Sequence, residues 1–286
     1  MSCSFFYLFM MFVVFFLSVF VMLVNNMFFW WGVFLFMTLL IVFLNKGESS
    51  YVSIFNYFVL QESLGLLFLL LFFGFFPSLL LMIKLGASPF HFWVIKVVGN
   101  MYGFNLVWFL TLHKLPFLMV MLQLFFLGLV FFLLLGLVFC LLQMFVLKTF
   151  KSLLVVSSIE SFNWILLGLV VSFFNVFFMF FYYVMLMVVL MYSLDLLSSL
   201  SYSYSWELML VFMNVPFSLG FFVKIFLLME FLKDFSFFVV LILFMMFLSV
   251  LSFSFWLVFL SSKSFNFFKY NSVYFFLVFF DSCVGF

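Results

Sequence analysis

The sequence predicts an all-α, polytopic membrane protein of about eleven transmembrane helices. Of the 286 residues, 71% are hydrophobic and only 6% are charged, and apolar runs recur along the whole chain. A soluble domain carries about 25% charged residues and could not cover its surface with so few. The runs are long enough to span a hydrocarbon core of about 30 Å. They lack the alternation of a membrane barrel, so helices are expected.

Polar, Gly and Pro positions divide the apolar runs into individual helices. Asn25 and Asn26 separate the first two spans, the polar segment 45–50 separates the next two, and later boundaries fall at similar positions. The predicted spans are 4–24, 27–44, 51–75, 78–98, 104–121, 123–147, 152–172, 173–194, 207–230, 236–260 and 268–283.

Lysines are distributed unevenly between the two sides of this topology. The side that carries the N-terminus receives Lys46, Lys96, Lys148, Lys151, Lys263 and Lys269. The other side receives only Lys233, next to Asp234. Because positive loops stay on the inner side of a membrane, the N-terminus is predicted there, which is the matrix in a mitochondrion.

Composition also narrows the function. The formal charge of +2 is too small to suggest a nucleic-acid partner. Cys3, Cys140 and Cys283 are far apart, so metal and disulfide sites are both disfavoured. The chain starts in an apolar run without a basic region, so no cleavable targeting peptide is expected. The 60 Phe residues and the absence of Arg fit either a lipid-facing surface or the bias of a small organellar genome.

Two predicted spans are interrupted by Gly and Pro. The fourth contains Gly86 and Pro89, and the ninth contains Pro216 and Gly220. Because proline removes a helical hydrogen bond and clashes with the preceding turn, both helices are expected to break. The two spans are five helices apart, an odd offset that predicts an inverted repeat, in which matching broken helices mark a transport site. Ordinary proline kinks are the alternative.

Five charged residues fall inside predicted spans: Lys84, Lys114, Lys224, Glu62 and Glu160. Each costs about 3 kcal/mol at the bilayer centre, so it needs pairing, hydration or a function. Snorkelling explains lysines near span ends but fits Lys114 and Lys224 poorly, since apolar sequence extends on both sides of them. Burial favours the neutral amine and a nearby carboxylate favours the ammonium, so buried lysines with carboxylates nearby suit proton transfer.

The two histidines lie beside these lysines. His91 is seven residues from Lys84, on the same face if that helix were unbroken, and it either relays protons or satisfies a carbonyl of the broken helix. His113, beside Lys114, is interpreted as structural. Glu62 and Glu160 each can pair with a lysine across the bundle, whereas Asp195 and Glu230 near span ends are expected to be solvated.

Several segments, in order along the chain, resemble the NADH-ubiquinone oxidoreductase chain 2 family. Lys84–Val94 resembles its K-L-G-x-x-P-F-H-F-W-V signature. Residues 56–61, 110–115, 157–164 and 216–224 are similar to its K-Y-F-L-x-Q, L-T-W-Q-K-L, S-S-I-x-x-x-G-W and P-P-L-T-G-F-x-P-K segments. The similarity covers most of the chain and weakens after about Lys233. The family is one of the antiporter-like membrane subunits of respiratory complex I, encoded in animal mitochondria.

This resemblance implies a fold of two inverted five-helix repeats, 1–122 and 123–262, and a C-terminal helix and tail, 263–286. It places Lys84, Lys114 and Lys224 on a buried lysine axis that carries protons, and His91 on the family's histidine. It also implies no cofactor on this chain, with FMN and iron–sulfur clusters in partner subunits. Neighbouring antiporter-like subunits and lipids of the mitochondrial inner membrane are the implied partners. The short, Phe-rich form resembles roundworm members.

Three positions depart from the family pattern. Phe34 stands where the family has a glutamate that modulates the first lysine, and Glu62 is the candidate substitute. The histidine expected near Ser161 is missing, with Glu160 adjacent. Residues 95–97 read Ile-Lys-Val where the family has Pro-Glu-Val, which reverses a charge.

Four functions are therefore compared. The first is a proton-translocating complex I subunit, and the second is a free-standing cation/proton antiporter of the same fold. The third is a structural complex I subunit with a degenerate proton path. A membrane-bound lipid enzyme ranks last, because no arrangement of nucleophile and base stands out.

Overall fold

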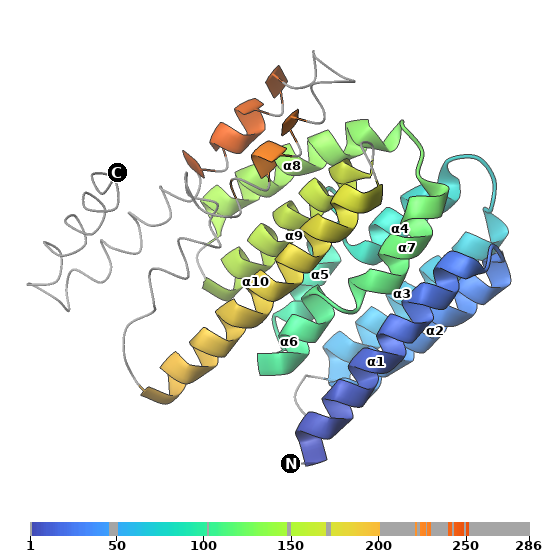
Figure 1. The fold of residues 1–286 in the computed structure, drawn as a ribbon, viewed down its shortest axis with the longest axis horizontal. Coiled ribbons are helices and arrows are strands. Elements are labelled where there is room, and N and C mark those ends of the chain that lie inside the picture. The colour runs from blue at the N-terminus through green and yellow to red at the C-terminus, as the bar shows by residue number, and fades with distance from the viewer. Residues whose placement is uncertain are drawn as a thin grey trace, which may run out of the picture.

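The computed structural model describes residues 2–45, 51–101, 103–147, 150–169 and 173–200, and parts of 221–251 (residues 221, 224–226, 228–229, 240–241, 243–248 and 250–251). Every regular element in this part of the chain is a helix (Figure 1). The predicted ninth, tenth and eleventh spans lie wholly or largely outside it, including the predicted break at Pro216 and Gly220.

The first eight predicted spans correspond to ten described helices, because two spans are broken. The helices are α1 (Ser2–Leu23), α2 (Met27–Leu44), α3 (Tyr51–Leu70), α4 (Phe76–Leu85), α5 (Phe92–Val98), α6 (Gly103–Leu110), α7 (Lys114–Leu124), α8 (Leu129–Val146), α9 (Phe150–Gly168) and α10 (Phe173–Leu200).

Several of these segments are long and apolar enough to cross a membrane. Four reach the length of a full span: α2, α3, α8 and the combined segment Gly103–Leu124 of α6 and α7. Shorter apolar stretches lie in α1, α4 and α10. Large apolar side chains also face outward, including Phe12, Phe28, Phe131 and Leu142, each more than half exposed. A lipid environment accounts for such a surface, which water would not tolerate.

Three hydrogen bonds join helix ends that the alternating topology places on the same side of the membrane. The Tyr7 hydroxyl near the start of α1 donates to Asn105 Oδ1 at the start of α6 (3.1 Å). Asn105 Nδ2 donates to the carbonyl of Leu44 at the end of α2 (3.2 Å). Lys151 Nζ at the start of α9 donates to the carbonyl of Gly99, just after α5 (2.8 Å). Each of these contacts joins ends that the sequence predicts on one side of the membrane.

The first break, between α4 and α5, lies where Gly86 and Pro89 predict it. Gly86 ends α4 in the left-handed region (φ +66°), and a Cβ there would lie 2.2 Å from Val94 Cγ2. Two other helices hold the connecting segment: Ser88 N donates to Asn163 Oδ1 of α9 (3.2 Å), and Ser88 Oγ donates to the carbonyl of Gly136 of α8 (2.7 Å). The break is therefore a built feature of the bundle, fixed by side chains of its neighbours.

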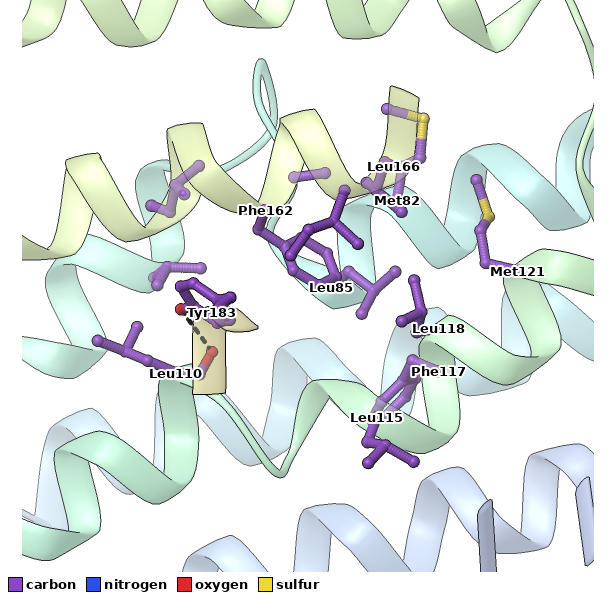
Figure 2. Close-up of a cluster of buried hydrophobic side chains, with 14 of the residues drawn as sticks. Met82, Leu85, Leu110, Leu115, Phe117, Leu118, Met121, Phe162, Leu166 and Tyr183 are labelled. Atoms are coloured by element: carbon purple, nitrogen blue, oxygen red, sulfur yellow. Dashed lines mark hydrogen bonds between the residues drawn. The ribbon is translucent and has the colours of Figure 1, made fainter. Parts of the chain in front are cut away.

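A second break, which the sequence analysis did not predict, separates α6 from α7 at residues 111–113, inside the predicted span 104–121. Pro116 is the third residue of α7, and its ring has no N–H to donate to the carbonyl of Leu112 and clashes with it. The carbonyl of Leu110, at the end of α6, accepts a hydrogen bond from the Tyr183 hydroxyl of α10 (3.0 Å; Figure 2).

The broken span of α6 and α7 lies in the centre of the bundle. Side chains of α4, α7, α9 and α10 meet there in one apolar cluster, which includes Met82, Leu118, Phe162 and Tyr183 (Figure 2). Both breaks therefore place backbone and polar side chains inside a layer that is otherwise apolar. The predicted charged residues lie in this layer.

Candidate functional site

The predicted site residues are almost all buried, as their positions inside apolar runs suggest. Lys84 and Lys114 are each 2% exposed, Lys224 is 4%, Glu160 is 1% and His91 is fully buried. Glu62 is half-buried. Snorkelling to the surface is thereby excluded for the three lysines, whereas Lys96, which the sequence placed near a span end, is exposed.

Lys84 occupies the last turn of α4, directly before the first break. Its Nζ lies 5.0 Å from the centre of the Phe34 ring and 5.9 Å from that of Phe117, so two aromatic faces accept its charge. A Cβ at Gly65 of α3 would lie 3.4 Å from this nitrogen, so the missing side chain leaves room for the lysine head group. Gln61 Nε2 donates to the lysine's carbonyl (3.2 Å) and fixes the backbone.

Phe34 fills the place where the resemblance predicts a glutamate. Its ring is fully buried and stacks on Phe117 (centroids 4.8 Å apart, 11° between planes). Glu62 is close enough to act electrostatically on Lys84, but the two make no direct ion pair among the contacts that the structure describes. The Thr38 hydroxyl donates to Glu62 Oε1 (2.6 Å). Phe34 therefore supplies a cation–π contact, and the carboxylate that acts on Lys84 is Glu62 of α3.

Lys114 begins α7, directly after the second break. Its Nζ finds no hydrogen-bond partner within the described part of the chain, although the atom is buried. The nitrogen lies 4.3 Å from the centre of the Phe162 ring of α9 and close enough to Cys140 of α8 for an electrostatic interaction. A buried amine of this kind is costly, so a structural role alone does not account for it.

Glu160 and Lys224 form a buried ion pair. Lys224 Nζ lies 2.8 Å from Glu160 Oε1, and the two side chains are 5% and 1% exposed. Trp164 Nε1 donates to the same oxygen (3.1 Å), and its ring lies 5.2 Å from the lysine nitrogen. Glu160 Oε2 is buried with no partner among the described residues. The carboxylate therefore keeps one oxygen available for a further hydrogen bond.

His91 does not face Lys84, because the break removes the helical register that would align them. It precedes α5, and its Nε2 is hydrogen-bonded to Gln143 Oε1 of α8, while its ring stacks on Phe92 (4.8 Å). The imidazole is thus directed from the first break toward α8. No described contact joins His91 to another candidate residue, and its hydrogen bond connects it to the C-terminal half of α8.

His113 is a polar residue that the sequence interpretation assigned only a structural role. Its Nε2 is 2.8 Å from the hydroxyl of Tyr57 of α3, and both side chains are buried. His113 is within electrostatic range of Lys84 and of Lys114, and Tyr57 is within range of Glu62. The signal that could have found this pair is the placement of a titratable ring next to Lys114 and three residues before Pro116.

Together these residues form a buried polar row from α3 to α9. Glu62 and Lys84 lie at one end, Lys114 follows, and the pair Glu160–Lys224 lies at the other, with Cys140 within electrostatic range of both Lys114 and Glu160. No cluster of three or more metal-ligating side chains occurs among the described residues. Amines and carboxylates at such positions can take up, hold and release protons.

Comparison with known proteins shows clear relatives. The chain is similar to NADH-ubiquinone oxidoreductase chain 2 of Caenorhabditis elegans, with 48% identity over 232 residues, which are 81% of this chain and 82% of the relative. It is equally similar to NADH-ubiquinone oxidoreductase chain 2 of Ascaris suum, with 48% identity over 248 residues, 86% of this chain and 82% of the relative. No protein-family profile matches the chain.

Proposed function

Because the chain belongs to the NADH-ubiquinone oxidoreductase chain 2 family, we propose that it moves protons across the membrane as a subunit of respiratory complex I. The protons pass along the buried lysine row while NADH reduces ubiquinone in the complex. The chain contributes the membrane path. The electron-transfer cofactors, FMN and iron–sulfur clusters, belong to partner subunits.

The observation that carries this proposal is the burial of three lysines, of which Lys114 has no hydrogen-bond partner among the described residues. Each lysine costs about 3 kcal/mol in a bilayer, so three cost about 9 kcal/mol, as much as a whole domain is stable. An unpartnered buried amine does not stabilise the packing of the bundle. It does serve a proton path, because in such a path the same group must exist both with and without its proton.

The energy scale of the lysine row fits this task. Moving one proton against a potential of about 170 mV costs about 4 kcal/mol. The Coulomb energy between an ammonium and a carboxylate about 4 Å apart, at an effective dielectric constant of about 20, is of the same size. A change in the distance between a lysine and its carboxylate, such as that between Lys84 and Glu62, therefore can drive release of one proton.

The proposed architecture has two inverted repeats, 1–122 and 123–262, followed by a C-terminal helix and tail at 263–286. The break before α5 belongs to the first repeat, and its proposed counterpart is the break that the sequence predicts at Pro216 and Gly220, outside the described residues. The hydrogen bonds among the ends of α1, α2, α6 and α9 and the segment after α5 agree with the alternating topology that this arrangement requires. The proposed location is the mitochondrial inner membrane, with the N-terminus in the matrix and other antiporter-like subunits as neighbours.

A structural subunit with a degenerate proton path is the second candidate, and Phe34 favours it. The buried ring removes a carboxylate that the resemblance predicts beside Lys84. A free-standing antiporter is the third candidate, and it differs in working without redox partners.

Two measurements separate these candidates. A native gel of mild-detergent extracts, stained for NADH oxidation and probed for this chain, tests assembly, and migration as a small separate species would favour the antiporter. Lys114→Met, in membranes that oxidise NADH, tests transport. The expected result is normal assembly with a lower number of protons moved per NADH oxidised.

Lys96→Met is the matched control, since it removes the same charge from an exposed position at the end of α5. It is expected to leave the ratio of protons to NADH unchanged. An unchanged ratio in both Lys114→Met and Lys224→Met would refute the proton path and leave the structural role.

A further inference from the structure

We propose that Tyr57 and His113 form the proton link between Lys84 and Lys114. This inference rests on the proposed proton path and names two members of it that the row of charged residues does not contain. The two lysines flank different breaks, on α4 and α7, and no described contact joins them directly.

The geometry of the pair is well defined. The Tyr57 hydroxyl and His113 Nε2 are 2.8 Å apart, and the side chains are 1% and 3% exposed. The imidazole is stacked on Phe109 (centroids 5.4 Å apart, 17° between planes). The ring of Phe117, one turn further along the chain, also packs against it (centroids 5.1 Å apart, 46° between planes). The hydrogen bond and the two rings hold one orientation of the imidazole inside the apolar layer.

The position of the pair is intermediate between the lysines. Phe117 contacts both Lys84 and His113, since its ring centre is 5.9 Å from Lys84 Nζ and 5.1 Å from the centre of the His113 ring. His113 directly precedes Lys114, and charge on either lysine acts on its imidazole. Glu62, the carboxylate that acts on Lys84, also acts on Tyr57. The hydrogen-bonded pair thus reaches both ends of the step.

The chemistry of the two side chains suits a relay. An imidazole can accept a proton on one nitrogen and release another from the second, and a phenol both donates and accepts. In the proposed step the Lys84 ammonium loses a proton to the Tyr57 hydroxyl through a bridging water. The hydroxyl releases its own proton to His113 Nε2, and His113 Nδ1 gives a proton to the neutral amine of Lys114. One proton moves in this step, and no electrons are transferred. The hydroxyl and the imidazole then reorient before the next proton is transferred.

The test is Tyr57→Phe, which removes one oxygen and keeps the ring. The variant complex is incorporated into liposomes, and proton uptake and NADH oxidation are measured together. A positioned proton-transfer group contributes about 100-fold or more to its step. The protons moved per NADH oxidised are therefore expected to fall, to a value like that of Lys114→Met.

Tyr183→Phe is the matched control, since it deletes a buried hydroxyl that donates to the carbonyl of Leu110, interacts with Ser158 and makes no described contact with Lys84 or Lys114. It is expected to lower stability without changing the proton ratio. His113→Phe is the second variant, because a ring of similar shape keeps the stacking on Phe109 but has no nitrogen to pass a proton; it too is expected to lower the ratio.

The outcomes separate the two proposals. A lower ratio in Lys114→Met with an unchanged ratio in Tyr57→Phe and His113→Phe would overturn the relay and leave the proton path intact. If Lys114→Met and Lys224→Met also left the ratio of protons to NADH unchanged, both the relay and the proton path would be overturned. A lower ratio in both relay variants, with Tyr183→Phe unaffected, supports the relay, because a merely structural hydrogen bond has no effect on that ratio.

Discussion

Replacing Glu160 by Gln should destabilise the protein because it leaves the Lys224 ammonium buried without its counter-charge. The ion pair is 2.8 Å long and both side chains are at least 95% buried. Removing one partner of such a pair costs about 3–5 kcal/mol. The amide oxygen still accepts the Trp164 Nε1 hydrogen bond now made to the carboxylate, so the lower value, about 3 kcal/mol, is expected. That energy corresponds to a factor of about 150 in an equilibrium or rate constant.

A double-mutant cycle measures this coupling. The half-life of NADH oxidation by the assembled complex at raised temperature is compared for the original chain, Glu160→Gln, Lys224→Met and the double variant. The single Glu160 variant is expected to lose its activity up to about 150 times faster. The double variant removes the orphan charge and is expected to regain most of that loss. Strictly additive effects of the two substitutions would refute the reasoning, because they would mean that the pair contributes no coupling.

Two further substitutions test the packing around the first break and the environment of the first lysine. Gly136→Ala is expected to reduce the amount of assembled complex on a native gel, since the new Cβ would lie 2.2 Å from the Ser88 carbonyl oxygen. Gly32→Ala is the control and is expected to be neutral, because no atom lies within 4 Å of a Cβ at that position. Phe34→Leu removes the ring that faces Lys84 and is expected to cost about 1–2 kcal/mol, measured as a shorter half-life of heat inactivation; an unchanged half-life would show that the ring does not stabilise the ammonium.

The fold could be predicted from the sequence wherever local chemistry decides it. The apolar runs predicted the first eight spans, and α2 has the bounds expected from Asn26, whose side chain caps the helix by accepting from Phe28 N (3.0 Å). Gly86 and Pro89 predicted the first break for the physical reason that the structure shows. The second break was missed, although Pro116 carried the same kind of information, because no glycine stood near it.

The candidate site was less predictable, because its contacts join residues far apart in the chain. Burial of Lys84 and Lys114 follows from their apolar neighbours. The choice of Glu160 as the partner of Lys224 depends on how α9 packs, and 64 residues separate the two. The role of Phe34 as a ring beside Lys84 could not be read from the sequence either, since cation–π contacts leave no spacing pattern across helices.

The packing of Gly65 against Lys84 has a consequence for how this chain can evolve. The lysine head group lies within 3.4 Å of the place a Cβ would take at position 65, and Trp31 Nε1 lies within 3.2 Å of it. Any larger residue there competes for the volume of the amine. The two positions should therefore change together in related mitochondrial lineages. A serine or alanine at 65 should accompany a shorter side chain at 84 or a smaller one at 31, and a change at 65 alone should be removed by selection.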